Sequence, residues 1–214
     1  MKLSILISGL VERAGQWLPL YYRLLRQAQG LPVEVLLLAD NRKAMPLPDK
    51  RNRLLAASTG DFVTFIDDDD DITLDYVSSI LAAIEANPDT HVICFEQSSY
   101  LDDGLNRFTV RTSLAYENEA VSKDAEGRWV DIKRKPWHWC VWRGDWGREA
   151  TFVSSTAEDW LWVEAIMKKC TKEVIIPKVL HLYNFEHKGS VALNGDPDLF
   201  SALPRYIIKP NPLL

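Results

Sequence analysis

The chain has 214 residues, of which 47% are hydrophobic and 26% charged, which is enough for one substantial core and near the usual upper size of one domain. Its formal net charge of -5 supplies no global attraction for nucleic acid, so a polyanion would have to be held by a local basic patch. Three separated cysteines, Cys94, Cys140 and Cys170, form no CxxC pair, which argues against a disulfide framework or a zinc site and favours a reducing cytoplasm.

The first half of the chain has the pattern of alternating strands and helices. Apolar residues recur at helical spacing from Trp17 to Ala28, and nearly continuous apolar runs such as 33–38 are typical of strands buried on both faces of a parallel sheet. The pattern predicts strands over residues 3–8, 33–38 and 62–66 and helices over residues 17–30, 50–59 and 73–87. The expected fold class is therefore α/β, with a Rossmann-like parallel half.

The second half has the pattern of a mixed sheet. It predicts strands over residues 91–96, 107–112, 174–176 and 179–183 and a helix over residues 158–170. A turn at Asp102-Asp103-Gly104 separates the first two strands and suggests antiparallel pairing, and Pro177 separates the last two. The proline-rich end, 204–214, is expected to be a surface tail.

Polar residues follow the first three predicted strands. Ser8-Gly9 ends the first strand, Asp40 follows the second, and the run Asp67 to Asp71 follows the third. Ligands of open α/β sheets bind beyond the carboxyl ends of the strands, where these residues would lie together. The sequence therefore predicts one polar, acidic crevice.

Five consecutive aspartates repel one another unless a cation or raised pKa values relieve them. In an extended backbone Asp67, Asp69 and Asp71 would share a face and offer oxygen ligands to Mg²⁺ or Mn²⁺. The alternative is that some of them cap the helix expected from Thr73.

Two further charged segments start predicted helices. Lys50-Arg51-Asn52 places positive charge at a helix start, which a diphosphate would compensate; the alternative is a solvated face. Glu158-Asp159 offers a carboxylate for general base catalysis, although Ser155 and Glu158 also have the spacing of a capping box.

Taken in order, these segments resemble the inverting glycosyltransferases of family 2, which have the GT-A fold, and especially short versions from bacteriophage genomes. The segments similar to the family are the first strand at 3–8, the nucleotide-contacting strand end at 37–41, the basic-Asn segment at 50–52, the DxD-containing strand at 65–70, the Glu-Asp pair at 158–159 and the closing segment at 182–190.

The resemblance implies a single GT-A domain over residues 1–203, with a nucleotide-sugar-binding half at 1–100, an acceptor half at 101–203 and a tail at 204–214. It implies that the donor, for which a UDP-sugar is favoured, is bound by Ser8, Asp40, Lys50, Arg51, Asn52, Asp67 and Asp68. Asp69 and His187 would hold Mn²⁺ or Mg²⁺, and Asp159 would be the base for transfer with inversion.

The acceptor is left open between a saccharide and phage DNA that carries a hydroxymethylated base. The segment 133–139, followed by Trp142-Arg143, interleaves basic and aromatic residues and suits either acceptor, whereas its tryptophans could equally belong to the core.

Two other functions compete with transfer: a non-catalytic module that binds carbohydrate or metal, and a sugar-phosphate nucleotidyltransferase, which a single glycine in residues 8–13 disfavours. The start of the chain has too short an apolar run for a signal peptide, and no run is long enough to span a membrane. A soluble protein of the cytoplasm, or of the host cytoplasm if phage-encoded, is expected.

Overall fold

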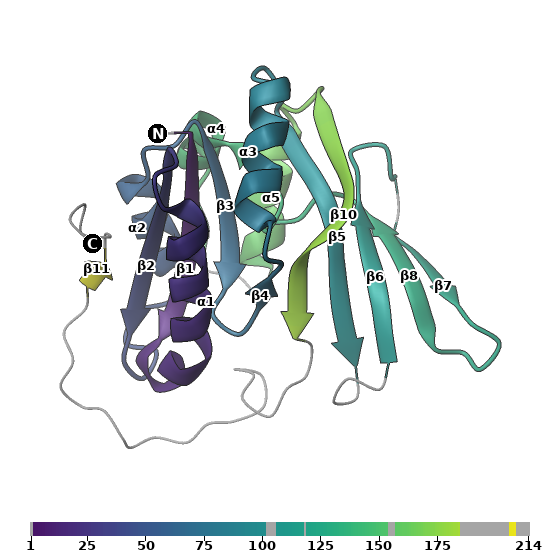
Figure 1. Cartoon of the computed structure of the whole chain (residues 1–214), viewed down its shortest axis with the longest axis horizontal. Coiled ribbons are helices and arrows are strands. Elements are labelled where there is room, and N and C mark those ends of the chain that lie inside the picture. The colour runs from purple at the N-terminus through teal and green to yellow at the C-terminus, as the bar shows by residue number, and fades with distance from the viewer. Residues whose placement is uncertain (1, 102–105, 118, 154–156, 185–205, 209–214) are drawn as a thin grey trace.

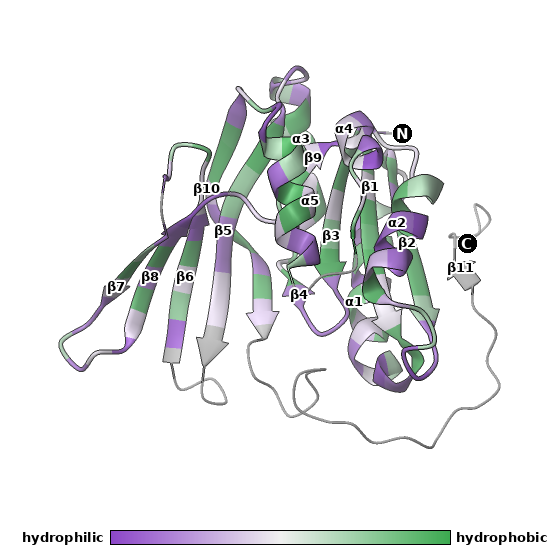
Figure 2. Cartoon of the chain, turned by 180° about the vertical axis from the view of Figure 1, so that it is seen from behind, coloured by the Kyte–Doolittle hydropathy of each residue, from purple (hydrophilic) through white to green (hydrophobic). Residues whose placement is uncertain are grey.

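The computed structural model describes residues 2–101, 106–117, 119–153, 157–184 and 206–208. Its first half is a parallel sheet made of β1 (Leu3–Leu10), β2 (Val33–Asp40) and β3 (Phe62–Asp67). β1 lies between the other two and pairs with both in parallel, so that Leu6 is level with Leu36 and Phe65. Figure 2 shows these three strands as mostly hydrophobic, as expected for strands covered on both faces. The predicted α/β fold with a parallel half is confirmed.

Helices cover both faces of this sheet (Figures 1 and 2). The first face carries α1 (Ala14–Ala28), which follows the short 3-10 helix η1 (Val11–Arg13), and α3 (Tyr76–Ala86). The other face carries α2 (Leu47–Ala57), α4 (Gly144–Glu149) and α5 (Glu158–Met167). α2 begins three residues earlier than predicted because Pro46 is its N-cap and a proline in the first turn has the backbone angle that a helix start needs.

The second half extends the sheet with strands of both directions, as the sequence pattern predicts. Its elements are β4 (Asp71–Ile72), β5 (Val92–Leu101), β6 (Asn106–Thr112), β7 (Ala120–Lys123), β8 (Trp129–Arg134), β9 (Val141–Arg143), β10 (Glu173–Asn184) and β11 (Tyr206–Ile208). In the described chain the order is β11-β2-β1-β3-β9-β5-β6-β8-β7, and β10 pairs with β5 and β4 beside this path. β9 joins the two halves because it pairs antiparallel with both β3 and β5.

Other details of the second half also differ from the sequence prediction. β10 is one strand across Pro177, with shifts of register between Ile176 and His181, because the irregular pairing accommodates a residue that cannot donate a hydrogen bond. α5 ends at Met167, three residues early. Tyr206–Ile208 pairs antiparallel with β2, so these three residues of the expected tail belong to the sheet edge. The predicted turn at 102–104 lies outside the described residues.

The hydrophobic core runs through both halves of the sheet. Trp142 and Trp162 are among its largest fully buried side chains, and their rings meet edge to face at 6.3 Å. Across the described part of the chain, no helix has the length and hydrophobicity that crossing a membrane requires.

Candidate active site

A pocket of about 390 Å³ opens where β1 and β3 end and α2 begins. Its walls are formed by Ser8, Leu10, Arg13, Lys43, Met45, Pro46, Leu47, Lys50, Arg51, Asp67, Asp68 and Asp69. Six of the residues singled out from the sequence, from three segments of the chain, thus meet in one cavity. Carboxylates and cations face each other across it, which is an arrangement suited to a ligand that carries both phosphate and hydroxyl groups.

The aspartate run forms a turn and not the extended segment expected from the sequence. Asp67 ends β3, and the amide of Asp70 donates a hydrogen bond of 3.2 Å to the carbonyl of Asp67. The turn sends Asp70 and Asp71 away from the pocket that the first three aspartates line. The expectation that Asp67, Asp69 and Asp71 share one face is therefore wrong. Capping is not the explanation either, since α3 begins only at Tyr76, after Asp75.

Arginine side chains relieve much of the repulsion within the run. The guanidinium of Arg13 forms ion pairs with Asp68, at 2.8 Å, and with Asp69. Arg23 pairs with Asp71. The protein itself thus supplies positive charge at the place where the sequence suggested a metal ion.

The ionised form of Asp68 remains unfavourable despite its ion pair with Arg13. Its side chain is 5% exposed and accepts a hydrogen bond of 2.9 Å from the amide of Leu10. Burial raises the pKa of Asp68 to about 7, and the charges of Asp67 and Asp69 add to this effect, while Arg13 and the amide oppose it. Asp68 therefore titrates near neutral pH in the absence of a further cation.

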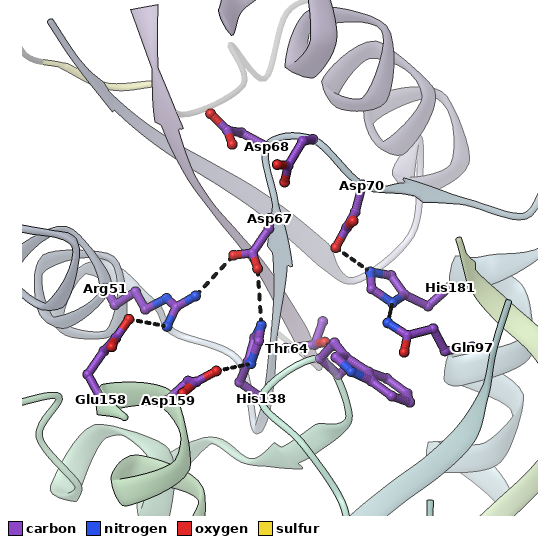
Figure 3. Close-up of polar contacts among 12 residues, drawn as sticks. Arg51, Thr64, Asp67, Asp68, Asp70, Gln97, His138, Glu158, Asp159 and His181 are labelled. Carbon is purple, nitrogen blue, oxygen red and sulfur yellow. Dashed lines mark hydrogen bonds and ion pairs between the residues drawn. The ribbon is translucent and has the colours of Figure 1, made fainter. Parts of the chain in front are cut away.

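Arg51 holds two carboxylates together at the inner end of the pocket (Figure 3). It donates to Asp67 at 3.0 Å and contacts Glu158 at 3.3 Å, and its side chain is 3% exposed. Its guanidinium also lies 5.3 Å from the centre of the Phe152 ring. Glu158 therefore serves this ion pair. Ala157 is the N-cap of α5, and Ser155, the other residue of the capping box expected from the sequence, lies outside the described residues.

His138 connects Asp67 with Asp159. Its Nε2 lies 3.4 Å from a carboxylate oxygen of Asp67, and its Nδ1 lies 3.4 Å from a carboxylate oxygen of Asp159 (Figure 3). Burial alone would lower the pKa of His138, but the charge of Asp67 and the contact with Asp159 raise it overall. His138 is thus favoured as an imidazolium ion that bridges two carboxylates.

The contact with His138 also lowers the pKa values of Asp67 and Asp159. Burial would raise the pKa of Asp67, but the charges of Arg51 and His138 hold it well below its usual range. Burial also opposes the ionisation of Asp159, and the contact with His138 outweighs it, so the pKa of Asp159 is lowered. Asp159 is 24% exposed and ionised at neutral pH, which makes it able to accept a proton.

Asp40 lies beneath the pocket and not in its wall. It is 1% exposed, accepts a hydrogen bond of 2.6 Å from the amide of Met45 and forms an ion pair with Lys50. Lys50 also donates to the carbonyl of Gly9 at 2.9 Å. The structure thus uses Asp40 to shape the loop before α2 and to hold Lys50 at the pocket wall.

Asn52 also faces away from the pocket. Its side-chain amide donates to the carbonyl of Phe152 and accepts from the amide of Phe152, both at 2.9 Å. Both hydrogen-bonding groups of the side chain are therefore used to fix the segment that follows α4.

A second histidine partners the fourth aspartate. His181 lies 3.1 Å from Asp70 and 2.9 Å from the side-chain amide of Gln97 (Figure 3). Its ring also stacks on that of Trp139. Burial raises the pKa of Asp70, which the charge of His181 opposes. This contact ties the aspartate turn to β10 and β5.

Two carboxylates on the pocket wall fit one divalent ion that would take its other ligands from a diphosphate and water. Asp68 and Asp69 supply hard oxygen donors, the type that Mg²⁺ and Mn²⁺ prefer, and Arg13 would have to yield its place to the ion. Among the described residues no group of three or more His, Cys, Asp or Glu side chains is placed to hold a metal. His187, the other expected ligand, lies outside the described residues.

The basic and aromatic segment does not form one surface. Trp139 and Trp142 are buried in the core, at 4% and 0% exposure, so for these rings the core alternative holds. Trp137 remains half-buried and stacks with Trp160 at a centroid distance of 5.5 Å.

Sequence reasoning missed three residues that organise the site: Arg13, His138 and His181. Arg13 had a signal, since it follows closely on the first strand, whose end was expected to meet the ligand. The two histidines come from distant segments, and only the pairing of β10 with β4 and the contact of residue 138 with the end of β3 bring them to the aspartates.

An open sheet with a parallel half, an acidic turn after its third strand and a late carboxylate linked to that turn through His138 are features of the GT-A class of glycosyltransferases. The model of glycosyl transferase family 2 matches residues 24–133, which is just over half of the chain. The chain belongs to glycosyl transferase family 2. A comparison with curated proteins gives no match.

Solved structures share this fold at low sequence identity. S. aureus TarS 1-349 is 15% identical with a TM-score of 0.62, covering 86% of this chain and 60% of that one, and its complex with UDP-GlcNAc gives a TM-score of 0.63. The mannosyltransferase PcManGT from Pyrobaculum calidifontis, in complex with GDP-Man and Mn²⁺, is 11% identical with a TM-score of 0.52, covering 88% and 58%. The chain therefore spans about 60% of the length of these two solved chains, and 37% of the longer S. aureus TarS structure.

Proposed function

We propose that the chain transfers a sugar from a nucleoside diphosphate sugar, with a UDP-sugar as the expected donor, to an acceptor hydroxyl with inversion at the anomeric carbon. Family membership supports sugar transfer, and similar solved folds are complexes with UDP-GlcNAc and with GDP-Man. The observation that carries the proposal is the bridge of His138 between Asp67, in the pocket wall, and Asp159. It joins a donor-sized pocket to an ionised carboxylate through one side chain.

In this proposal the pocket binds the nucleoside diphosphate. Asp67 and Ser8 face the ribose and base, while Lys50 and Arg51 lend positive charge to the wall that meets the phosphates. Arg13 is the further cation of the pocket. Mn²⁺ or Mg²⁺, when bound at Asp68 and Asp69, would neutralise charge on the diphosphate as it leaves.

Asp159 acts as the base. The acceptor oxygen forms its bond to the anomeric carbon, the bond from that carbon to the diphosphate oxygen breaks, and the electron pair leaves with the diphosphate. The hydroxyl proton passes to the Asp159 carboxylate. His138 is a positioning residue in this scheme, since it contacts Asp159 and Asp67 but neither reacting atom. It holds the carboxylate in one orientation and keeps it ionised.

Asp159→Asn tests the base. The variant should bind UDP-sugars as the wild type does, measured by calorimetry with Mn²⁺ present, while the release of UDP in the presence of acceptor falls by at least about a hundredfold, the usual contribution of general base catalysis. Glu164→Gln, a change in a half-buried carboxylate of the same helix, is the matched control and should leave both quantities unchanged.

Two results would decide against this assignment. Full transfer by Asp159→Asn removes Asp159 from the base role. Donor binding without transfer in the wild type, across acceptors of all classes, would favour a non-catalytic binding module.

A further inference from the structure

A second pocket, of about 320 Å³, lies beside the proposed base. It is lined by Glu117, Glu119, Arg134, Lys135, Trp137 and Trp160. Its two tryptophans directly neighbour the bridge in sequence: Trp137 precedes His138, and Trp160 follows Asp159. The ring of Trp137 also lies 6.3 Å from the ring of His138, whose Nδ1 contacts Asp159 at 3.4 Å, so a ligand in this pocket would lie near the bridge that holds the proposed base.

The aromatic part of the pocket is built before any ligand arrives. Trp137 and Trp160 stack with an interplanar angle of 25°, and the guanidinium of Arg134 lies 4.0 Å from the centre of the Trp137 ring. All three side chains are half-buried. Because Trp137 already has Arg134 over its ring, Trp160 is the ring we expect a ligand to contact. Preorganised indole rings suit the apolar face of a sugar.

The charged part of the pocket is balanced and not basic. Two carboxylates, Glu117 and Glu119, face two cations, Arg134 and Lys135. Arg134 lies 3.5 Å from Glu119, and Lys135 donates a hydrogen bond of 2.6 Å to the carbonyl of Leu114. To bind a phosphate backbone, Arg134 and Lys135 would have to give up these contacts. The phosphates would also lie near two exposed carboxylates, and this like-charge repulsion costs free energy. Hydroxyl groups, in contrast, can donate to the carboxylates.

We infer that this pocket is the acceptor subsite and that it takes a neutral saccharide, whose ring stacks on Trp160 and whose hydroxyls donate to Glu117 and Glu119. This inference rests on the proposed function, because it assigns the acceptor of the same reaction. It favours a saccharide over DNA, the two acceptors that the sequence leaves open. The segment that looks basic in the sequence contributes two cations to this pocket, and both already have partners within the protein.

The test is saturation-transfer NMR with neutral methyl glycosides of glucose, galactose, mannose and N-acetylglucosamine, together with a short DNA duplex containing hydroxymethylcytosine, on the full chain with UDP bound. At least one glycoside should show saturable binding, and Trp160→Ala should weaken it by about tenfold, the effect of losing one stacking ring. Trp129→Ala removes a half-buried tryptophan outside the pocket and should not change it.

Glu117→Gln gives a second readout that does not depend on the ring. It should weaken glycoside binding, whereas a pocket for DNA would bind the duplex more tightly once this negative charge is lost. Tighter duplex binding, equal glycoside binding by Trp160→Ala, or no glycoside binding by a protein that binds UDP would each overturn the inference. Failure to bind UDP would count against the proposed function instead, and the two failures are thus separable.

Discussion

Replacing Asp68 with asparagine should stabilise the protein at alkaline pH. Asp68 is 5% exposed, and its pKa is raised to about 7 from an ordinary value of 3.8. At roughly 1.4 kcal/mol per pKa unit, this displacement corresponds to an upper limit of about 4 kcal/mol for holding the charged carboxylate in the folded state. Asparagine keeps an acceptor for the amide of Leu10 but loses the charge that faces Arg13. We therefore expect a net gain of about 1–3 kcal/mol at pH 8.

The pH dependence gives the sharper form of this prediction. A carboxyl group whose pKa is raised on folding binds its proton more tightly in the folded state, so its favourable contribution is present below pH 4 and is lost as the pH rises through about 7. The raised pKa values of Asp70 and His138 act in the same direction. Wild-type stability should therefore fall between pH 5 and pH 8, and that of Asp68→Asn should fall less.

Urea denaturation followed by tryptophan fluorescence, in EDTA, measures both quantities. Asp71→Asn is the matched control, since it removes a neighbouring carboxylate of the run that is 35% exposed and faces Arg23. Its stability should follow the wild-type dependence on pH. If Asp68→Asn is no more stable than the wild type at pH 8 and has the same slope, the electrostatic account of the aspartate turn is refuted.

Three further variants test other parts of the site. His138→Gln should lower the free energy of unfolding by about 1–3 kcal/mol at pH 5.5 and by less at pH 9. A histidine whose pKa is raised on folding contributes stability at low pH, and this contribution is lost as the pH rises through the folded-state pKa. Equal losses at both pH values would contradict the assignment of His138 as an imidazolium ion. Asn52→Ala should lower the free energy of unfolding, measured by urea denaturation, by about 1–3 kcal/mol because the contacts with Phe152 are lost. The affinity for UDP, measured by calorimetry, should not change. A loss of UDP affinity would mean that Asn52 belongs to the donor site. Arg13→Gln should raise the affinity for Mn²⁺ about tenfold in electron paramagnetic resonance titrations, because it removes a cation that competes with the metal for Asp69. A lower affinity would mean that Arg13 helps to assemble the metal site.

The fold was predictable because its strands carry an unmistakable pattern. Runs such as 3–8 and 33–38 are nearly continuous in apolar residues. A strand of this kind is covered on both faces, which leads directly to a parallel sheet with helices on each side. The start of α2 was harder, since Leu47-Pro48 precedes the periodic residues. The continuity of β10 across Pro177 depends on an irregular pairing with β5 that local sequence does not specify.

Half of the residues that line the pocket were also predictable, but the partners of these residues were not. Ser8 is level with Asp67 near the carboxyl ends of neighbouring strands, and the topology alone brings the two residues to one edge. Asp40 and Asn52 show the limit of this reasoning. Each has a residue type that suits a ligand site, yet each uses its polar atoms within the protein. Asp40 contacts the amide of Met45 and the side chain of Lys50, and Asn52 contacts the backbone of Phe152, which only the folded chain reveals.

The measurement that tests the central claim most directly is a calorimetric titration of the protein with UDP, GDP, CDP and their common sugar conjugates, with and without Mn²⁺. The account predicts saturable binding of one nucleotide series, with UDP-sugars favoured, strengthened by Mn²⁺ and weakened by Asp69→Ala, which removes a carboxylate from the pocket wall. The absence of binding for every nucleotide in both conditions would contradict the assignment of this pocket as a donor site.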